Sequence, residues 1–216
     1  ACGEKNIIFT NNDSAYETAI SLIQKGIIIE AIIDNREEID SKLLYEIKKN
    51  NIKIFTGYTI TNTFGYKRIN KISIMQLSKD GQKVIGSKIY LSCDCLGLSG
   101  GWTPAVHLFT QSGGKLKFRD KDQAFIPNNY PSDQISIGAC NGDYTLDEIL
   151  TNTSNSLKES LNVKNTEYDN LEILSSINKS KRNIWLLPSD KIIGKTKPFI
   201  DYQNDATAKD IKLALR

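Results

Sequence analysis

The stretch Cys93–Gly114, CDCLGLSGGWTPAVHLFTQSGG, decides the fold. An apolar strand led by Ile89–Leu91 runs into it and breaks at Gly100-Gly101, and Pro104 follows shortly after. Small residues at the end of a strand let the backbone pass close to another group, because a side chain there would obstruct the approach. We therefore expect Gly100 and Gly101 to lie against a neighbouring group, and the chain on either side of them to form separate units.

The residues before this stretch predict a nucleotide-binding-type βαβαβ unit. Short apolar runs alternate with amphipathic helical patterns, which is typical of a parallel sheet. Two alternating segments then flank a turn and predict an antiparallel excursion. The expected strands are 5–10, 27–33 and 52–55, the helices are 15–23 (stopped by Gly26) and 40–50, and the excursion pairs 68–77 with 83–91.

The residues after this stretch predict part of a second such unit. A strand from Gln134 containing Ile135 and Ile137 should lead into Gly138–Gly142, and a helix should follow from Thr145 or Leu146 to Leu161. We expect four regions: an inserted NAD(P)-binding-type subdomain at 1–98, the return of the first dinucleotide-binding domain at 99–161, a polar linker at 162–197, and a helical module at 198–216. Thr207 is the expected cap of the last helix.

Composition excludes several function classes. The 216 residues carry 25% charged and 39% apolar residues and a net charge of +3, which is ordinary for a soluble globular protein and too small to indicate nucleic-acid binding. No apolar run is long enough for a membrane span. The four cysteines form no CxxC pair, so we expect small buried thiols, no metal site and a cytoplasmic location. We also expect the chain to be a fragment of a longer protein, because no initiating Met or terminal stop signal is present.

No catalytic set can be assembled. The single histidine, His107, has no acid or nucleophile near it in sequence, and we expect it to be packed or to cap a helix. Cys93 and Cys95 should share one face of a single strand.

The first strand-to-helix turn is a weak candidate for a nucleotide site. It reads Asn11-Asn12-Asp13-Ser14, where a dinucleotide-binding turn would carry GxGxxG. Asp13 places an anion at the helix start, so a self-capped helix is the alternative to phosphate binding. Asp34 follows at the distance of a ribose-binding acid. Without the glycines, the pattern favours Asp34 as a solvent-exposed residue at the end of a strand over a ribose-binding acid.

The bend Gly138–Gly142 is a stronger candidate. A strand ending in small residues before a helix lets backbone N–H groups approach an anion. A tight structural turn is the alternative. The expected cofactor-binding residues at this bend are Gly138, Ala139, Cys140, Asn141, Gly142, Tyr144 and Thr145. Gly100 and Gly101 are expected to bind the cofactor as well.

Three segments carry a resemblance to a known family. FTNNDSAYETA (9–19), SGGWTPAVHLFTQSGGKL (99–116) and FIDYQNDATAKDIKLALR (199–216) resemble the alpha subunit of heterotetrameric sarcosine oxidase in order and spacing. The same region is similar to opine and proline dehydrogenase subunits. The wider architecture resembles the pyridine nucleotide-disulfide oxidoreductases.

The resemblance implies an oxidoreductase subunit that acts on CH–NH donors. It implies that NAD is held by this chain, that FAD and FMN lie elsewhere in the complex, and that tetrahydrofolate binds a C-terminal domain outside this chain. The implied partners are the beta, gamma and delta subunits. The implied reaction oxidises sarcosine to glycine, with transfer of the methylene group to tetrahydrofolate.

The chain departs from related patterns at two places. Asn141 stands where flavin reductases carry an aspartate over the cofactor, which favours NAD over FAD. The tail resembles the start of the iron–sulfur module of bacterioferritin-associated ferredoxins. The matching positions, Asp201 and Gln203 or Asn204, offer no thiolate, so no cluster is expected. Three alternative functions remain: a stand-alone NAD(P)H/FAD-dependent reductase of the disulfide-oxidoreductase type, an opine or proline dehydrogenase subunit, and a non-enzymatic interaction module.

Overall fold

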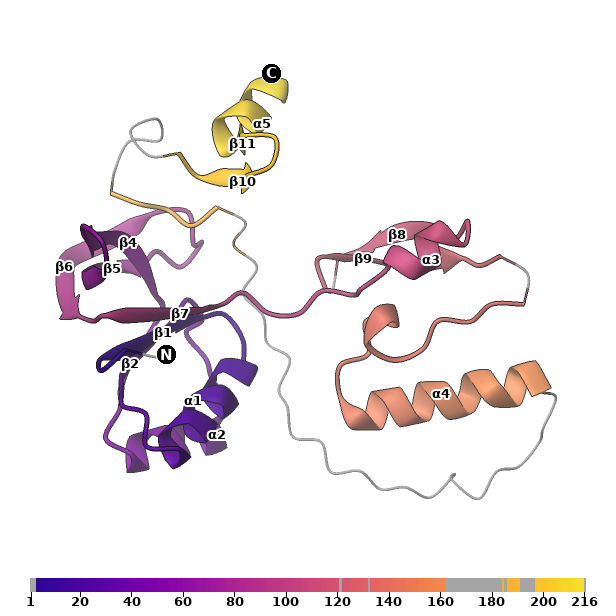
Figure 1. Cartoon of the computed structure of the whole chain (residues 1–216), viewed down its shortest axis with the longest axis horizontal. Helices are drawn as coiled ribbons and strands as arrows, with labels where there is room; N and C mark the ends of the chain where they lie inside the picture. Colours follow the sequence, from indigo (N-terminus) through magenta and orange to yellow (C-terminus); the bar gives the residue numbers. More distant parts are fainter. Residues whose placement is uncertain are drawn as a thin grey trace. The chain divides into compact units, whose positions relative to one another are not determined.

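A computed structural model describes residues 3–120, 122–131, 133–161, 184, 186–190 and 197–215 (Figure 1). The chain divides into two compact units, one formed by Ala1–Gly101 with Lys179–Arg216 and the other by Trp102–Asn178. Among the described residues, no helix has the length and apolarity needed to cross a bilayer.

A parallel sheet with two helices opens the first unit and confirms the α/β fold class. Its strand order is β3-β2-β1-β7, and each neighbouring pair is parallel. The side chain of Asp40 caps the second helix by accepting a hydrogen bond from Lys42 N at 2.8 Å. The elements are β1 (Asn6–Thr10), α1 (Ser14–Gln24), β2 (Ile29–Asp34), α2 (Ser41–Lys49), β3 (Lys53–Thr56) and β7 (Cys95–Ser99).

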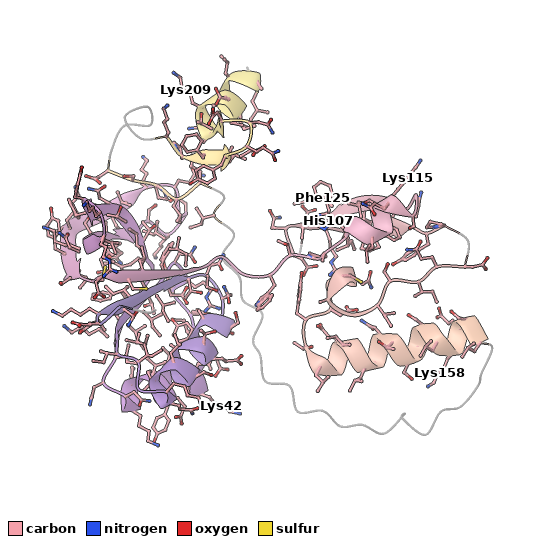
Figure 2. All side chains as sticks on the ribbon, viewed as in Figure 1. Lys42, His107, Lys115, Phe125, Lys158 and Lys209 are labelled. Carbon is pink, nitrogen blue, oxygen red and sulfur yellow. The ribbon has the colours of Figure 1, made fainter. Side chains whose placement is uncertain are left out.

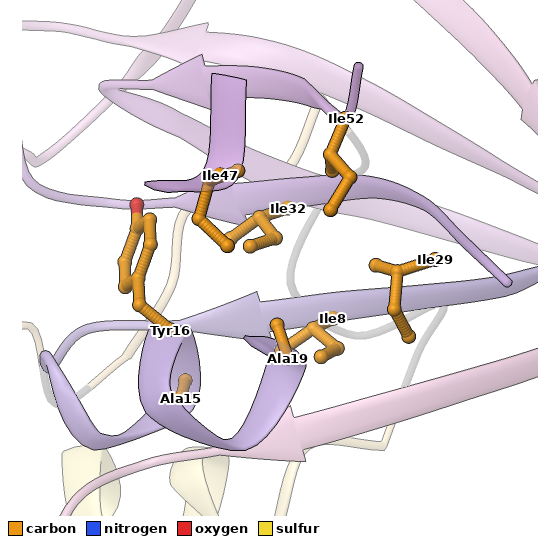
Figure 3. Close-up of a cluster of buried hydrophobic side chains, with 8 residues drawn as sticks. All are labelled: Ile8, Ala15, Tyr16, Ala19, Ile29, Ile32, Ile47 and Ile52. Atoms are coloured by element: carbon orange, nitrogen blue, oxygen red, sulfur yellow. The ribbon is translucent and has the colours of Figure 1, made fainter. Parts of the chain in front are cut away.

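The parallel sheet is covered on both faces. Because successive residues of a strand point to opposite faces, Ile8 packs toward the helices and Ile7 toward the antiparallel sheet. Figure 3 shows the helix-side cluster, in which every residue is buried. Its members are Ile8, Ala15, Tyr16, Ala19, Ile29, Ile32, Ile47 and Ile52.

The antiparallel excursion has three strands rather than the expected two. They are β4 (Tyr58–Gly65), β5 (Ile69–Leu77) and β6 (Val84–Ser92), in the order β4-β5-β6. The pairing of β5 with β6 confirms the expected hairpin. Strand β4 was not expected from the sequence. Its most buried residues are Thr59 and Thr61, whereas Tyr58 and Ile60, which pack against the core cluster between the two sheets, are only partly buried.

The expectation that Cys93 and Cys95 share one continuous strand is wrong. Strand β6 ends at Ser92 and β7 begins at Cys95, so the chain changes sheets between them. Asp94 occupies the break, and its carboxylate accepts hydrogen bonds from Glu4 N at 2.9 Å and Lys5 N at 2.8 Å. The chain therefore leaves the antiparallel sheet and re-enters the parallel one beside β1.

The second unit contains a β-hairpin and a long helix. The hairpin pairs β8 (Lys115–Arg119) with β9 (Ala124–Asn129) and follows the short helix α3 (His107–Gln111). The helix α4 (Leu146–Leu161) confirms the expected one. His107, labelled in Figure 2, begins α3 with an exposed side chain, so the expectation of a packed histidine is wrong.

The strand expected from Gln134 to Ile137 does not form. These residues are assigned to no strand, and Ile135 and Ile137 are exposed to 48% and 41%. An extended segment becomes a strand only when a neighbour pairs with its backbone, and no strand among the described residues pairs with this one.

The tail forms a small module of its own. A two-stranded pair, β10 (Phe199–Asp201) with β11 (Ala206–Thr207), precedes α5 (Ala208–Ala214). Thr207 caps α5 in a reciprocal box with Asp210, as the sequence predicts. The expected linker at 162–197 lies largely outside the described residues.

Candidate functional site

The bend before α4 requires its two glycines. The 3₁₀ turn η1 (Gly138–Asn141) begins at Gly138, where φ is +74°, and ends on Gly142, where φ is +82°. Both values lie in the left-handed region that side-chain-bearing residues avoid. The sequence has glycine at the two positions of the bend where φ is positive. These two glycines allow the main chain of the bend to pack against α4.

One side of the bend is closed by an arginine. Arg119 Nη2 donates a hydrogen bond to the Gly142 carbonyl at 3.2 Å, and a Cβ atom on Gly142 would collide with the guanidinium. Arg119 is also ion-paired with Asp122. On the other side, Ala139 is exposed and Cys140 is half-buried. Within the described residues, the side of Ala139 and Cys140 is therefore the more accessible side of the bend.

The half-buried side chains of the bend have local partners. The Cys140 thiol donates to the Ile137 carbonyl at 3.1 Å. The Tyr130 hydroxyl donates to Asn141 Oδ1 at 3.4 Å. Burial, with the negative charge of Asp122 as a smaller cause, raises the pKa of the Tyr144 phenol to about 12. The phenol consequently stays protonated at neutral pH.

Two buried oxygen atoms beside α4 lack a hydrogen-bond partner in the described part of the chain. Asp143 is 7% exposed and Thr145 is 5% exposed, yet Asp143 Oδ2 and Thr145 Oγ1 have no hydrogen-bond partner within the described part of the chain. Leaving such groups unsatisfied is costly, so a ligand that pairs with them is favoured. A carboxylate oxygen accepts from a hydroxyl and repels a phosphate. The pair therefore fits the ribose hydroxyls of a dinucleotide better than its pyrophosphate.

The turn between β1 and α1 differs from the self-capped helix start expected from the sequence. Asp13 does not cap α1 with its side chain. Its carboxylate instead forms an ion pair with Arg36, with Asp13 Oδ1 and Arg36 Nη1 2.7 Å apart, and both side chains are buried. Sequence reasoning missed Arg36, because an arginine that follows a strand is usually exposed.

Asp34 at the end of β2 is fully buried, so the reading of this residue as a solvent-exposed strand end is wrong. Its Oδ2 lies 2.8 Å from Arg36 Nη2 and accepts a hydrogen bond from the Tyr16 hydroxyl at 3.0 Å. The Arg36 backbone N–H donates to Asp34 Oδ1 at 2.9 Å. The Asp34–Arg36 pair at i and i+2 was the only sequence signal for this arrangement.

Gly101 lies beside the β1–α1 turn at ordinary van der Waals distance, so the expectation that a side chain there would obstruct the approach is wrong. Its φ is +96°, and a Cβ atom there would lie 3.6 Å from Asn11 Oδ1 and 3.8 Å from Asn12 Nδ2. The neighbour of the glycine is thus the β1–α1 turn. Gly100 faces open space, and the Ser14 hydroxyl donates to Asn12 Oδ1 at 2.5 Å. Whether any of these residues contacts a nucleotide stays a prediction.

Carboxylates, thiols and the histidine do not gather into a metal site in the described ranges, where no group of three or more such residues could hold an ion.

Comparison with known proteins identifies sequence relatives. No family model matches the sequence. The sarcosine oxidase subunit alpha of Corynebacterium sp. (strain U-96) is 26% identical over 97% of this chain and 22% of its own length. The subunit of the same name from Rhizobium meliloti (strain 1021) is 26% identical over 100% of this chain and 21% of its own length. The chain thus spans about a fifth of the length of the curated relatives it matches.

Solved structures share parts of the backbone. The thioredoxin reductase of T. acidophilum is 17% identical, with a TM-score of 0.44 over 71% of this chain and 53% of its own. A bacillithiol disulfide reductase of Bacillus cereus is 13% identical, with a TM-score of 0.48 over 68% of this chain and 45% of its own. The resemblance carried by the three sequence segments is confirmed: along nearly its whole length, the chain is similar to one region of sarcosine oxidase alpha subunits.

Proposed function

We propose that this chain is a region of the alpha subunit of a sarcosine-oxidising flavoenzyme complex. The supporting observation is the similarity to sarcosine oxidase alpha subunits over 97% of the chain. Because the chain spans only 22% of that relative, the proposed activity belongs to the larger cytoplasmic assembly with its beta, gamma and delta subunits. That activity is the oxidation of sarcosine to glycine, with methylene transfer to tetrahydrofolate.

Within this assembly the chain frames NAD and does no chemistry itself. The bend from Gly138 to Gly142 offers backbone groups at close range, and Asp143 and Thr145 offer buried oxygens to ribose hydroxyls. Bound NAD supplies a nicotinamide ring able to accept or donate a hydride. FAD and FMN lie elsewhere in the complex, and tetrahydrofolate binds a domain outside this chain. Ala139, Cys140, Asn141 and Tyr144 complete the proposed site.

Purification of the native complex tests the proposed activity. We expect the chain to co-purify with three other subunits, and the preparation to consume oxygen when sarcosine is added. A lone protein that oxidises NADH, without a response to sarcosine, would identify a stand-alone reductase instead. A complex that oxidises another N-methyl amine or an opine would keep the subunit role and change the substrate.

The NAD site is tested with a matched pair of threonine variants. Thr145→Val keeps the shape of the side chain and removes the unpaired Oγ1, whereas Thr151→Val makes the same change at an exposed position of α4. We expect chromatography of the extracted nucleotide to show less NAD per complex in T145V and an unchanged content in T151V. Equal NAD content in both variants would remove Thr145 from the site.

A further inference from the structure

The parallel sheet places a potential ligand crevice in the first unit. In the order β3-β2-β1-β7, the chain proceeds from β1 to β2 on one side and returns as β7 on the other. The carboxyl ends of β1 and β7 therefore form a topological switch point, which is where open parallel sheets bind ligands. A dinucleotide at such a point needs three places: the β1–α1 turn for its pyrophosphate, the gap between the two strands, and the end of β2 for its ribose.

The carboxylate of Asp34, at the end of β2, has no free acceptor for a ribose hydroxyl. Both oxygens of Asp34 are engaged, Oδ1 by the Arg36 N–H and Nε groups at 2.9 and 3.1 Å, and Oδ2 by Arg36 Nη2 and the Tyr16 hydroxyl at 2.8 and 3.0 Å. A carboxylate offers about four lone-pair sites. The side chain is also fully buried. A ribose could bind here only by displacing Arg36 or Tyr16.

The β1–α1 turn already contains a fixed carboxylate. Asp13 is 4% exposed and is held by Arg36, which also binds Asp34. Two carboxylates and one guanidinium leave this buried group with a net charge of −1. A pyrophosphate placed at the start of α1 would meet that negative charge, and like charges in a poorly solvated place repel strongly.

The gap between β1 and β7 is bridged by an asparagine. Asn12 is 6% exposed, and its Nδ2 donates to Ser99 O at 3.2 Å, to Ser99 Oγ at 3.0 Å and to Asn11 Oδ1 at 3.0 Å. Its Oδ1 accepts from the Ser14 hydroxyl. The amide thus ties the turn to the end of β7 across the path that a pyrophosphate would follow.

We propose that this subdomain is closed to nucleotides by its own side chains. The triad of Asp13, Arg36 and Asp34 takes the place of a dinucleotide as the link between the β1–α1 turn and the end of β2, and Asn12 does the same between β1 and β7. The subdomain then has a nucleotide-binding-type fold but serves as a scaffold and binds no nucleotide. Asn11, Asn12, Ser14 and Asp34 become structural residues. The proposal does not depend on the NAD site proposed for the second unit.

Hydrogen–deuterium exchange of the complete protein, with and without saturating NADH and NADPH, tests the proposal. We expect unchanged exchange in peptides covering 10–16 and 31–36, and protection confined to other regions. Protection of 10–16 together with 31–36 by either nucleotide would overturn the inference. If neither nucleotide protects 10–16, 31–36 or 138–145, the result would support the closed subdomain and contradict the proposed NAD site. The experiment therefore distinguishes a failure of this inference from a failure of the proposed NAD site.

A substitution of Arg36 distinguishes two roles for this residue, a structural role in the triad and the binding of a nucleotide phosphate. If Arg36 bound the 2′-phosphate of NADPH, Arg36→Met would weaken NADPH binding at least tenfold and leave NADH binding unchanged. The closed subdomain predicts that R36M alters neither dissociation constant. Arg68→Met serves as the charge control, because Arg68 is an exposed arginine of the antiparallel excursion and is not among the groups that act on Asp13. Should R36M fail to fold, the wild-type exchange footprint still decides the question.

Discussion

The Tyr16 hydroxyl donates a hydrogen bond to Asp34 Oδ2 at 3.0 Å, and both side chains are completely shielded from water. This bond joins the first turn of α1 to the end of β2. Burial, followed by the negative charge of Asp34, raises the pKa of the Tyr16 phenol well above its usual value of 10.0. The phenol therefore acts only as a donor in the physiological pH range, and it helps to stabilise a carboxylate that is buried.

Tyr16→Phe should destabilise the protein by about 1.5–3 kcal/mol, because it removes a hydrogen bond to a buried charged group. Tyr45→Phe makes the same chemical change on a side chain that is 67% exposed, and it should leave the free energy of unfolding nearly unchanged. Urea unfolding of both variants measures the difference. Equal midpoints would mean that the Tyr16 hydroxyl contributes nothing to stability.

Arg36→Met should cost about 3–5 kcal/mol of unfolding free energy at neutral pH, because two buried carboxylates lose their cation. Arg68→Met, at an exposed position, is the control and should change stability by no more than about 0.5 kcal/mol. Chemical denaturation provides the measurement. A loss in R36M no larger than that in R68M would show that the triad does not hold the subdomain together.

The penalty of R36M should shrink as the pH falls. Burial raises the folded-state pKa of Asp13 above 3.8 although Arg36 opposes this, so removing Arg36 raises it further. A carboxyl whose pKa is raised in the folded state favours folding below its unfolded pKa, and this contribution is lost as the pH rises through the folded pKa. The stability gap between wild type and R36M should accordingly be smaller near pH 4 than near pH 7. A gap that widens on acidification would contradict this assignment.

Gly142→Ala should destabilise the second unit more than Gly113→Ala. Both glycines have left-handed backbones, with φ of +82° and +94°, so each substitution carries a similar strain of about 1–2 kcal/mol. The added methyl at Gly113 meets open space, whereas at Gly142 it displaces Arg119 from its hydrogen bond with the carbonyl. Urea unfolding of the two variants should differ by about 0.5–1.5 kcal/mol. Indistinguishable curves would show that Arg119 adjusts without cost.

Cys93 should react with iodoacetamide much more slowly than Cys140 in the folded protein. Cys93 is 1% exposed, and burial raises the pKa of its thiol, which reduces the reactive thiolate. Cys140 is half-buried in the bend before α4. Mass spectrometry of timed alkylation would measure both sites in one experiment. Modification of Cys93 at the rate of Cys140 would mean that the interface between the two sheets opens readily.

The helices were predictable because their signals are local. Helix α2 has Asp40 as its side-chain cap and Asn50 at its end, and α4 starts and stops where the apolar spacing does. Strand β4 was missed because its core-facing residues Tyr58 and Ile60 are only partly buried, whereas its buried positions are threonines. Thr61 is satisfied by a hydrogen bond with the Ser73 hydroxyl at 2.9 Å, so this buried face shows no hydrophobic pattern in the sequence. The prediction of a strand at Gln134–Ile137 was wrong for the opposite reason. The segment has an apolar pattern, but a strand also needs a neighbouring strand to pair with, and the local sequence does not show whether one is present.

The candidate sites show the same limit. The glycines at 138 and 142 were identified correctly as turn positions because a left-handed backbone nearly always selects glycine. The pairing of Asp13 with Arg36 was not foreseen, because the two residues lie on different elements and meet only when β1 and β2 align. A charged residue can be predicted to be buried only when its partner in the folded structure is known. The spacing of residues in the sequence does not identify that partner.

The position of Asp94 also bears on how the chain is assembled during synthesis. Its carboxylate binds the backbone of Glu4 and Lys5, and β7 completes the pairing of β1, so the sheet closes through residues about 90 positions apart. Until β7 leaves the ribosome, one edge of β1 lacks its partner, and such late, distant pairing is slow. Nascent chains stalled before Cys95 emerges should be cut by protease far more readily than chains stalled after Ser99 has emerged. Equal resistance would mean that the nascent half-sheet is already stable.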